Sequence, residues 1–124
     1  MSLDFQSSLG LFEKGSKLIP SCTQTFSKGS TQYPFGVSPV FAEAADGCYV
    51  WDVDGNKFID CVMALGPVIF GHNYPPVNEA VKAQIDKGVA FSLPHRKEIE
   101  LAQKLCEIIP CAEMVRFGKN GSDA

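Results

Sequence analysis

Residues 113–124 constrain the fold of this chain more than any other segment. Residues 114–117 are mostly apolar and predict a buried strand, and the glycines at 118 and 121 predict a turn after it. Ser122 and Asp123 are typical of the first residues of a helix. A strand, a glycine turn and a helix N-terminus present several backbone N–H groups to an anion, usually a phosphate. We therefore expect the chain to be the front part of a larger protein that binds a phosphate-bearing cofactor.

The composition argues against a nucleic-acid-binding protein and a membrane protein. The 124 residues carry a net charge of −3 and are 45% hydrophobic, without a strongly basic patch. No apolar run approaches the roughly 20 residues that span a bilayer, and the N-terminus lacks the pattern of a secretion signal. The five cysteines include no Cys-x-x-Cys pair, and the two histidines lie far apart in the sequence. These features predict a cytoplasmic protein with reduced, mostly buried thiols and no metal site.

The pattern of apolar and turn residues predicts a small antiparallel sheet followed by two helices. Asp46-Gly47 and Asp54-Gly55-Asn56 supply the positive φ angles that tight hairpin turns require. The expected elements are a helix over residues 3–19, an extended segment over 21–39, strands over 40–45, 48–53 and 57–61, a helix from 75 that ends at Gly88, and a helix over 95–109 with Ser92 or Pro94 as a cap. The side chains expected to face inward from the two later helices are Val77, Ala80, Val81, Ala83 and Ile85, and Ile99, Ala102, Leu105, Cys106 and Ile109.

Three short motifs each allow two interpretations on local chemistry alone. Residues 118–124 could form a phosphate cup or a plain turn with a helix N-cap. Residues 52–56 superficially resemble a calcium loop, but Met63 stands where an EF-hand needs glutamate, which favours a hairpin turn. His72, just before a predicted helix, could belong to a functional site or have a purely structural role.

Several motifs in one order and spacing resemble the class III aminotransferases, and within them the glutamate-1-semialdehyde aminomutase-like members most closely. The resemblance covers nearly the whole chain past Ser38. The motifs are Tyr49 to Asp60 with Asp52-Val53-Asp54-Gly55 at its centre, Gly66-Pro67-Val68-Ile69-Phe70-Gly71-His72, Glu113-Met114-Val115-Arg116-Phe117 and Asn120-Gly121-Ser122-Asp123-Ala124.

The resemblance implies the fold and the cofactor. The fold class would be α/β, the N-terminal part of a PLP-dependent transferase of fold type I, which is aspartate aminotransferase-like. The cofactor would be pyridoxal 5'-phosphate (PLP). Residues 1–68 would form the N-terminal helix, the extended segment and the β-meander of the small domain, and residues 69–124 would begin the large PLP-binding domain. The protein would be a homodimer with its active sites at the subunit interface.

The resemblance also implies site residues. Asn120, Gly121 and Ser122 would hold the cofactor phosphate. Ala64, Leu65 and Gly66 would line the pocket for a small-molecule amino donor and acceptor. The family's Schiff-base lysine and its ring-binding residues would lie beyond residue 124, so this stretch would contain no catalytic residue.

Two departures from the family bear on the substrate. The aminomutases usually carry a tryptophan where this chain has Leu65, and an arginine in the segment where residues 21–39 contain Lys28 but no arginine. A substrate other than glutamate semialdehyde therefore stays open, as does the choice between amino transfer and an intramolecular amino shift. A non-catalytic interaction module derived from the family is the alternative function.

Overall fold

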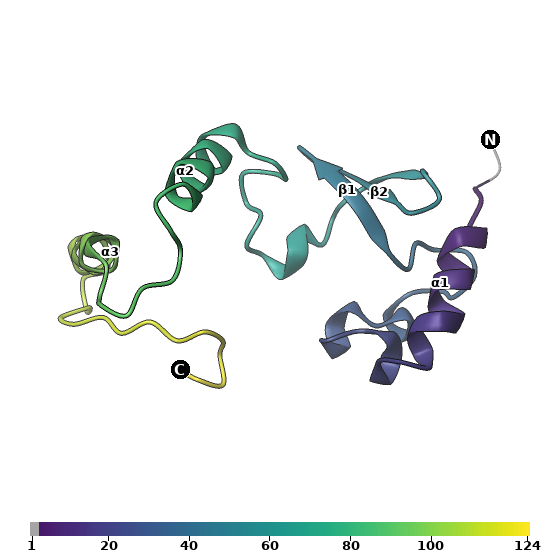
Figure 1. Cartoon of the computed structure of the whole chain (residues 1–124), viewed down its shortest axis with the longest axis horizontal. Coiled ribbons are helices and arrows are strands. Elements are labelled where there is room, and N and C mark those ends of the chain that lie inside the picture. The colour runs from purple at the N-terminus through teal and green to yellow at the C-terminus, as the bar shows by residue number, and fades with distance from the viewer. Residues whose placement is uncertain (1–2) are drawn as a thin grey trace. The chain divides into compact units, whose positions relative to one another are not determined.

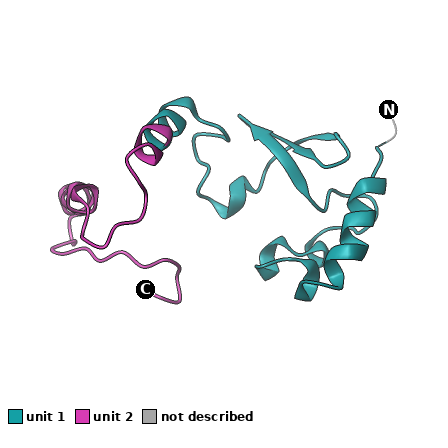
Figure 2. Ribbon diagram, viewed as in Figure 1, with its two compact units in different colours: residues 1–81 teal, residues 82–124 magenta. Residues whose placement is uncertain are grey.

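The computed structural model describes residues 3–124, and its chain divides into two compact units, residues 1–81 and residues 82–124 (Figures 1 and 2). In chain order the elements are α1 (Gln6–Ser16), η1 (Pro20–Cys22), η2 (Phe26–Lys28), η3 (Ser30–Gln32), β1 (Ala42–Asp46), β2 (Tyr49–Asp52), β3 (Lys57–Ile59), η4 (Met63–Leu65), α2 (Pro75–Ile85) and α3 (Arg96–Ile108), where η denotes a 3-10 helix.

The first unit is organised around an antiparallel sheet with the strand order β1-β2-β3. The predicted meander is confirmed, with shorter strands than expected and a register irregularity between Ala42 and Ala44. Gly47 and Gly55 take φ angles of 54° and 82° at the two hairpin turns. Both turns need these left-handed conformations, which glycine adopts without a steric cost.

The turn between β2 and β3 joins two antiparallel strands, which confirms the hairpin interpretation of residues 52–56. Several polar contacts hold this turn. The Asp52 side chain is only 2% exposed. Its carboxylate accepts hydrogen bonds from the backbone N–H of Asp54 at 3.0 Å and of Asn56 at 2.8 Å, and from Asn56 Nδ2 at 2.8 Å. A buried carboxylate with several donors is satisfied without a cation.

The same turn caps α1, which lies far away in the sequence. The N-cap residue Phe5 has no side-chain acceptor, so the first N–H groups of the helix need partners from elsewhere. Asp54 accepts from the backbone N–H of Ser7 at 2.6 Å and of Ser8 at 2.9 Å. Partial burial pushes the pKa of Asp54 up, but the hydrogen bonds from Ser8 and Ser7 outweigh it and leave this pKa lowered. The negative charge also complements the positive end of the helix dipole.

Residues 21–39 do not form the extended segment that the sequence predicted. They fold into the 3-10 turns η1, η2 and η3, joined by extended residues. Phe35 packs against Phe12 of α1, with ring centroids 4.9 Å apart. Short local hydrogen bonds and this aromatic contact therefore fold the segment back onto its own helix.

The helices α2 and α3 occur where the sequence predicted them, but α3 is capped differently. His95, and not Ser92 or Pro94, is the N-cap residue. Its Nδ1 accepts from the backbone N–H of Lys97 at 3.3 Å, while Glu98 Oε1 accepts from the backbone N–H of His95 at 3.0 Å. This reciprocal arrangement is a capping box, with histidine in the place of the usual serine or threonine.

The apolar side chains expected to face inward are not buried. Among residues 3–124 no hydrophobic side chain is buried. Val81 of α2 is 51% exposed and Ile99 of α3 is 69% exposed, while Ala102, Leu105 and Cys106 are half-buried. The five cysteines are free, as expected, but Cys48, Cys61 and Cys111 are exposed. Amphipathic helices bury their apolar faces only against other elements, and these residues offer too few.

We predict that the 124-residue chain, produced by itself, lacks a cooperative fold. Hydrophobic burial is the dominant stabilising term in folding, and no described apolar side chain is buried. Thermal unfolding followed by near-ultraviolet circular dichroism should show a broad change without a sigmoidal transition, together with binding of a hydrophobic dye. A sharp transition from a monodisperse monomer would contradict this prediction.

Candidate functional site

The glycine turn of the second unit has a different backbone from the one predicted. Residues 114–117 form no strand, and residues 121–123 form a turn and not the start of a helix. A strand needs a neighbour for its backbone groups, and the second unit contains no other strand among its described residues, 82–124. The turn itself is closed by hydrogen bonds from the backbone N–H groups of Asp123 and Ala124 to the Asn120 carbonyl, at 3.1 and 3.3 Å.

This turn already directs backbone N–H groups at an anionic oxygen. The N–H groups of Lys119 and Asn120 donate to Asp123 Oδ2 at 3.1 and 3.2 Å. Within the described chain, the N–H groups of Gly121 and Ser122 and the Ser122 hydroxyl engage in no hydrogen bond. A carboxylate oxygen and a phosphate oxygen accept from such amides in the same way. The donor set of the turn therefore fits a phosphate.

Gly121 leaves room beside these donors. A Cβ atom added at Gly121 would meet no atom within 4 Å, whereas one added at Gly118 would approach Asp123 Cβ at 3.3 Å. Gly121 is not one of the glycines with a positive φ angle, so its backbone conformation does not itself require glycine.

The predicted pocket loop of the first unit adopts a left-handed turn. Met63, Ala64 and Leu65 have φ angles of 50°, 50° and 69°, and Gly66 follows at 112°. The N–H groups of Leu65 and Gly66 donate to the carbonyls of Val62 and Met63, each at 2.9 Å. A left-handed conformation costs a non-glycine residue about 1–2 kcal/mol. Three such residues in succession need contacts that hold them there.

Asp60 supplies those contacts and His72 holds Asp60, although no sequence pattern predicted a role for Asp60. Asp60 Oδ1 accepts from the backbone N–H of Val62 at 2.8 Å and of Met63 at 3.0 Å, where the left-handed turn begins. Asp60 Oδ2 lies 2.6 Å from His72 Nε2, with both side chains largely buried, at 15% and 21% exposure. The one sequence signal for this pair was His72 after a glycine, and it pointed to no partner.

The pair is tied to the β1–β2 hairpin, which fixes the base of the loop. His72 and Gly47 exchange both backbone hydrogen bonds, at 2.8 and 3.0 Å. Gly71 has a φ angle of 85°, and a Cβ atom there would lie 3.0 Å from the Gly47 carbonyl oxygen. Asp60 itself donates its N–H to the Cys48 carbonyl at 2.9 Å. The two ends of the loop therefore meet at one hairpin.

The hydrogen bond with His72 is the main reason that the pKa of Asp60 lies below its ordinary value of 3.8. Desolvation opposes this shift, and the N–H groups of Val62 and Met63 add to it. Because the folded pKa lies below the unfolded one, the ionised carboxylate stabilises the loop above about pH 4. This contribution is lost as the pH falls through the lowered folded pKa.

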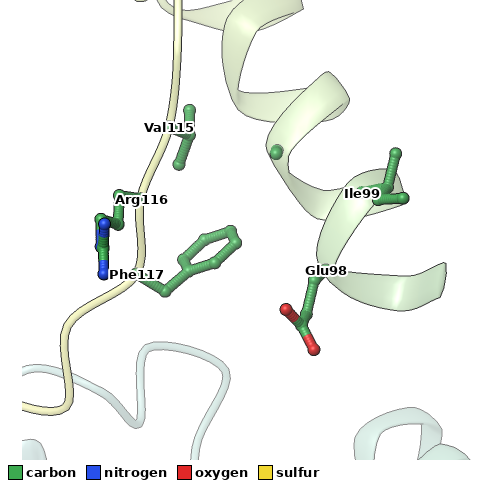
Figure 3. A pocket seen from close by; sticks show the side chains of 6 residues that line it. Glu98, Ile99, Val115, Arg116 and Phe117 are labelled. Carbon is green, nitrogen blue, oxygen red and sulfur yellow. The ribbon is translucent and has the colours of Figure 1, made fainter. Parts of the chain in front are cut away.

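A surface hollow of about 370 Å³ lies in the second unit, and none of the predicted site residues lines it. It is lined by Glu98, Ile99 and Ala102 of α3 and by Val115, Arg116 and Phe117. Figure 3 shows the Phe117 ring turned toward the helix, while Arg116 points away from it. The hollow thus lies between the partly covered face of α3 and residues 115–117, which belong to the segment predicted to be a strand.

The described residues contain no cluster of three or more potential metal-ligating His, Cys, Asp or Glu side chains. Within the same residues, no helix has the length and apolar character needed to cross a membrane.

Comparison with known proteins assigns the chain to a family. Residues 32–124 match the family model of class III aminotransferases. The chain belongs to the class III aminotransferase family. This bears out the resemblance of its motifs, and it confirms the expected fold class together with the solved structures described below.

The curated relatives are named as aminomutases. The chain is 38% identical over 114 residues to glutamate-1-semialdehyde 2,1-aminomutase of Syntrophobacter fumaroxidans, covering 92% of this chain and 26% of the relative. It is 40% identical over 124 residues to the enzyme of the same name from Methanocaldococcus jannaschii, covering all of this chain and 28% of the relative. The chain thus spans about a quarter of the length of these curated relatives.

Solved structures show the same fold. An omega-transaminase from Sphaerobacter thermophilus is 33% identical, with a TM-score of 0.84 over 95% of this chain and 26% of that chain. A transaminase with PLP bound is 28% identical, with a TM-score of 0.74 over 85% of this chain and 24% of that chain. The arrangement described here is therefore that of a segment of a PLP-dependent fold type I enzyme.

Proposed function

We propose that this chain is the N-terminal part of a PLP-dependent class III aminotransferase or glutamate-1-semialdehyde aminomutase-like enzyme. The observation that carries the proposal is the family match over residues 32–124, joined by aminomutase relatives that are 38–40% identical along 92–100% of the chain. Such an enzyme moves an amino group from a donor to an acceptor by way of pyridoxal and pyridoxamine phosphate.

Within this enzyme, Asn120, Gly121 and Ser122 bind the cofactor phosphate. The unengaged N–H groups of Gly121 and Ser122, the Ser122 hydroxyl and the open space beside Gly121 support this assignment. The bound cofactor supplies the electron sink that stabilises negative charge on the substrate carbon. The turn itself binds and orients the phosphate. Asp123, whose carboxylate now accepts from the N–H groups of Lys119 and Asn120, has to yield any of these donors that the phosphate uses.

Ala64, Leu65 and Gly66 line the pocket for a small-molecule amino donor and acceptor. The left-handed backbone supports this role, because strained residues cluster at ligand-binding sites. Leu65 is 58% exposed, so it is available to a substrate. An aliphatic side chain where the aminomutases usually carry tryptophan gives a wider wall with less capacity for stacking. This favours an amino acceptor other than glutamate semialdehyde.

The assembly and the location follow from the same proposal. The enzyme is a homodimer with its active sites at the subunit interface, and the exposed apolar faces of α2 and α3 are consistent with further packing partners. Residues 1–68 belong to the small domain and residues 69–124 to the large one. Five free cysteines are consistent with a reducing cytoplasm.

The alternative function is a non-catalytic interaction module derived from the family. It conflicts with the prediction that the 124 residues lack a cooperative fold. Such a module has to fold cooperatively as 124 residues, whereas the described residues contain no buried apolar side chain.

The experiment that tests the proposed function uses the complete protein that contains this chain, purified with PLP. We expect visible absorption from bound cofactor and transfer of an amino group from a common donor such as L-glutamate. A protein that shows neither would refute the function.

Gly121→Val should abolish tight PLP binding in the complete protein. The added side chain would enter the space that the phosphate needs, while the local backbone should tolerate it, because Gly121 has no positive φ angle and no neighbour within 4 Å of a Cβ atom. Equilibrium titration with PLP, followed by absorption, measures the affinity, and far-ultraviolet circular dichroism should stay unchanged. Gly10→Val is the matched control, since Gly10 also has open space around it. Equal PLP affinity in the two variants would remove the phosphate assignment.

Leu65→Trp should change the choice of acceptor without changing cofactor absorption. An indole narrows the pocket, and one apolar group in a pocket discriminates by about 1–3 kcal/mol, so the ratio of kcat/KM for pyruvate over phenylpyruvate should rise roughly tenfold. If Leu65 instead packs beneath the loop, the larger ring overpacks it and lowers the melting temperature. A destabilised enzyme with unchanged preferences would contradict the pocket role.

A further inference from the structure

Few hydrogen bonds hold the left-handed turn at Met63–Leu65. Its own hydrogen bonds, from the N–H groups of Leu65 and Gly66, lie inside the turn, and the N–H of Val68 donates to the Met63 carbonyl at 3.5 Å. The remaining anchor is Asp60 Oδ1, which accepts from the N–H groups of Val62 and Met63 at 2.8 and 3.0 Å. Without this acceptor, only these backbone hydrogen bonds oppose the steric cost of positive φ angles at three successive non-glycine residues.

His72 fixes the acceptor in place. A free carboxylate rotates about χ2 and offers either oxygen to the loop. Asp60 Oδ2 is bound to His72 Nε2 at 2.6 Å, and the His72 backbone is bonded on both sides to Gly47. The second oxygen is thereby committed, and Oδ1 faces the loop. A hydrogen bond to a charged acceptor that is largely shielded from water is stronger than a neutral one at the surface.

We propose that Asp60 and His72 are a positioning pair that sets amino-acceptor specificity by holding Met63–Leu65 in the left-handed conformation. The pair acts through Leu65, and neither residue touches the reacting atoms. This inference rests on the proposed function, because it takes Leu65 as a wall of the substrate pocket. In a right-handed conformation of the turn, the Leu65 side chain would leave from a different direction, and the wall would be lost.

The test compares Asp60→Ala and His72→Leu in the complete PLP-loaded protein, with L-glutamate as donor and pyruvate or phenylpyruvate as acceptor. We expect each variant to change the ratio of kcat/KM between the two acceptors by roughly tenfold, with the visible absorption of the cofactor unchanged. Hydrogen exchange in a peptide spanning residues 62–68 should become faster, which reports the loop without reference to activity. Should Asp60→Ala not fold, Asp60→Leu tests the same bonds, because it roughly keeps the side-chain shape and removes both acceptor oxygens.

A double-mutant cycle separates a positioning role from a merely structural one. In a Leu65→Ala background, Asp60→Ala should alter the acceptor ratio less than twofold, because the side chain through which the pair acts is gone. A change of equal size in both backgrounds would overturn the proposal. So would an unchanged ratio accompanied by a lower melting temperature.

Rescue by a glycine substitution is a second test of the positioning pair. Glycine adopts positive φ without a steric cost, so adding Ala64→Gly to Asp60→Ala should restore part of the acceptor ratio and slow the exchange of residues 62–68. No recovery in either measurement would contradict the left-handed turn as the controlled element. Asp54→Ala is the matched control, because that carboxylate caps α1 and not the loop. It should lower the melting temperature and leave the acceptor ratio unchanged.

The behaviour of the wild-type protein distinguishes failure of the proposed function from failure of the positioning pair. A wild-type protein without bound cofactor or amino transfer refutes the proposed function. An active wild-type enzyme whose acceptor ratio ignores Asp60 and His72 refutes only the positioning pair.

Discussion

The carboxylate of Asp60 is the contact on which the geometry of the first unit's loop depends. One oxygen accepts from the start of the left-handed turn, and the other binds His72, which is bonded to the β1–β2 hairpin at Gly47. Because no apolar side chain is buried among residues 3–124, such polar contacts decide how the connecting segments lie. A largely buried, charge-assisted hydrogen bond can do this, since its donors and acceptors would be costly to leave unpaired.

Carboxylates at both ends of the small sheet therefore bind the segments that lie next to it. At the β2–β3 turn, Asp52 organises the turn and Asp54 caps α1. At the opposite end, Asp60 accepts from the start of the loop over residues 62–66 and is bound to His72. A sheet of this size is marginal by itself. Its hydrogen-bonded ends explain how it can order a helix on one side and a loop on the other.

The exposed apolar faces of α2 and α3 agree with the fraction of its relatives' length that the chain spans. It spans about a quarter of the length of its curated relatives, and helices in an α/β domain bury their faces against a sheet. Residues 114–117 show the same dependence, because their predicted strand has no partner strand in residues 82–124. The turn that follows needs no partner, and its amides already converge on the Asp123 carboxylate.

The sequence by itself determined the features that depend on local chemistry. Asp-Gly pairs located both hairpin turns, the proline at 75 located the start of α2, and the order of the motifs pointed to the family that the comparisons confirmed. Contacts between distant residues were decided only by the tertiary structure. Asp54 caps α1 by accepting from Ser7 and Ser8, which lie 47 and 46 positions away in the sequence. The Asp60–His72 pair stabilises backbone angles that Met63, Ala64 and Leu65 do not prefer locally. Local propensity cannot reveal such conformations, because the free energy that holds them comes from side chains elsewhere in the chain.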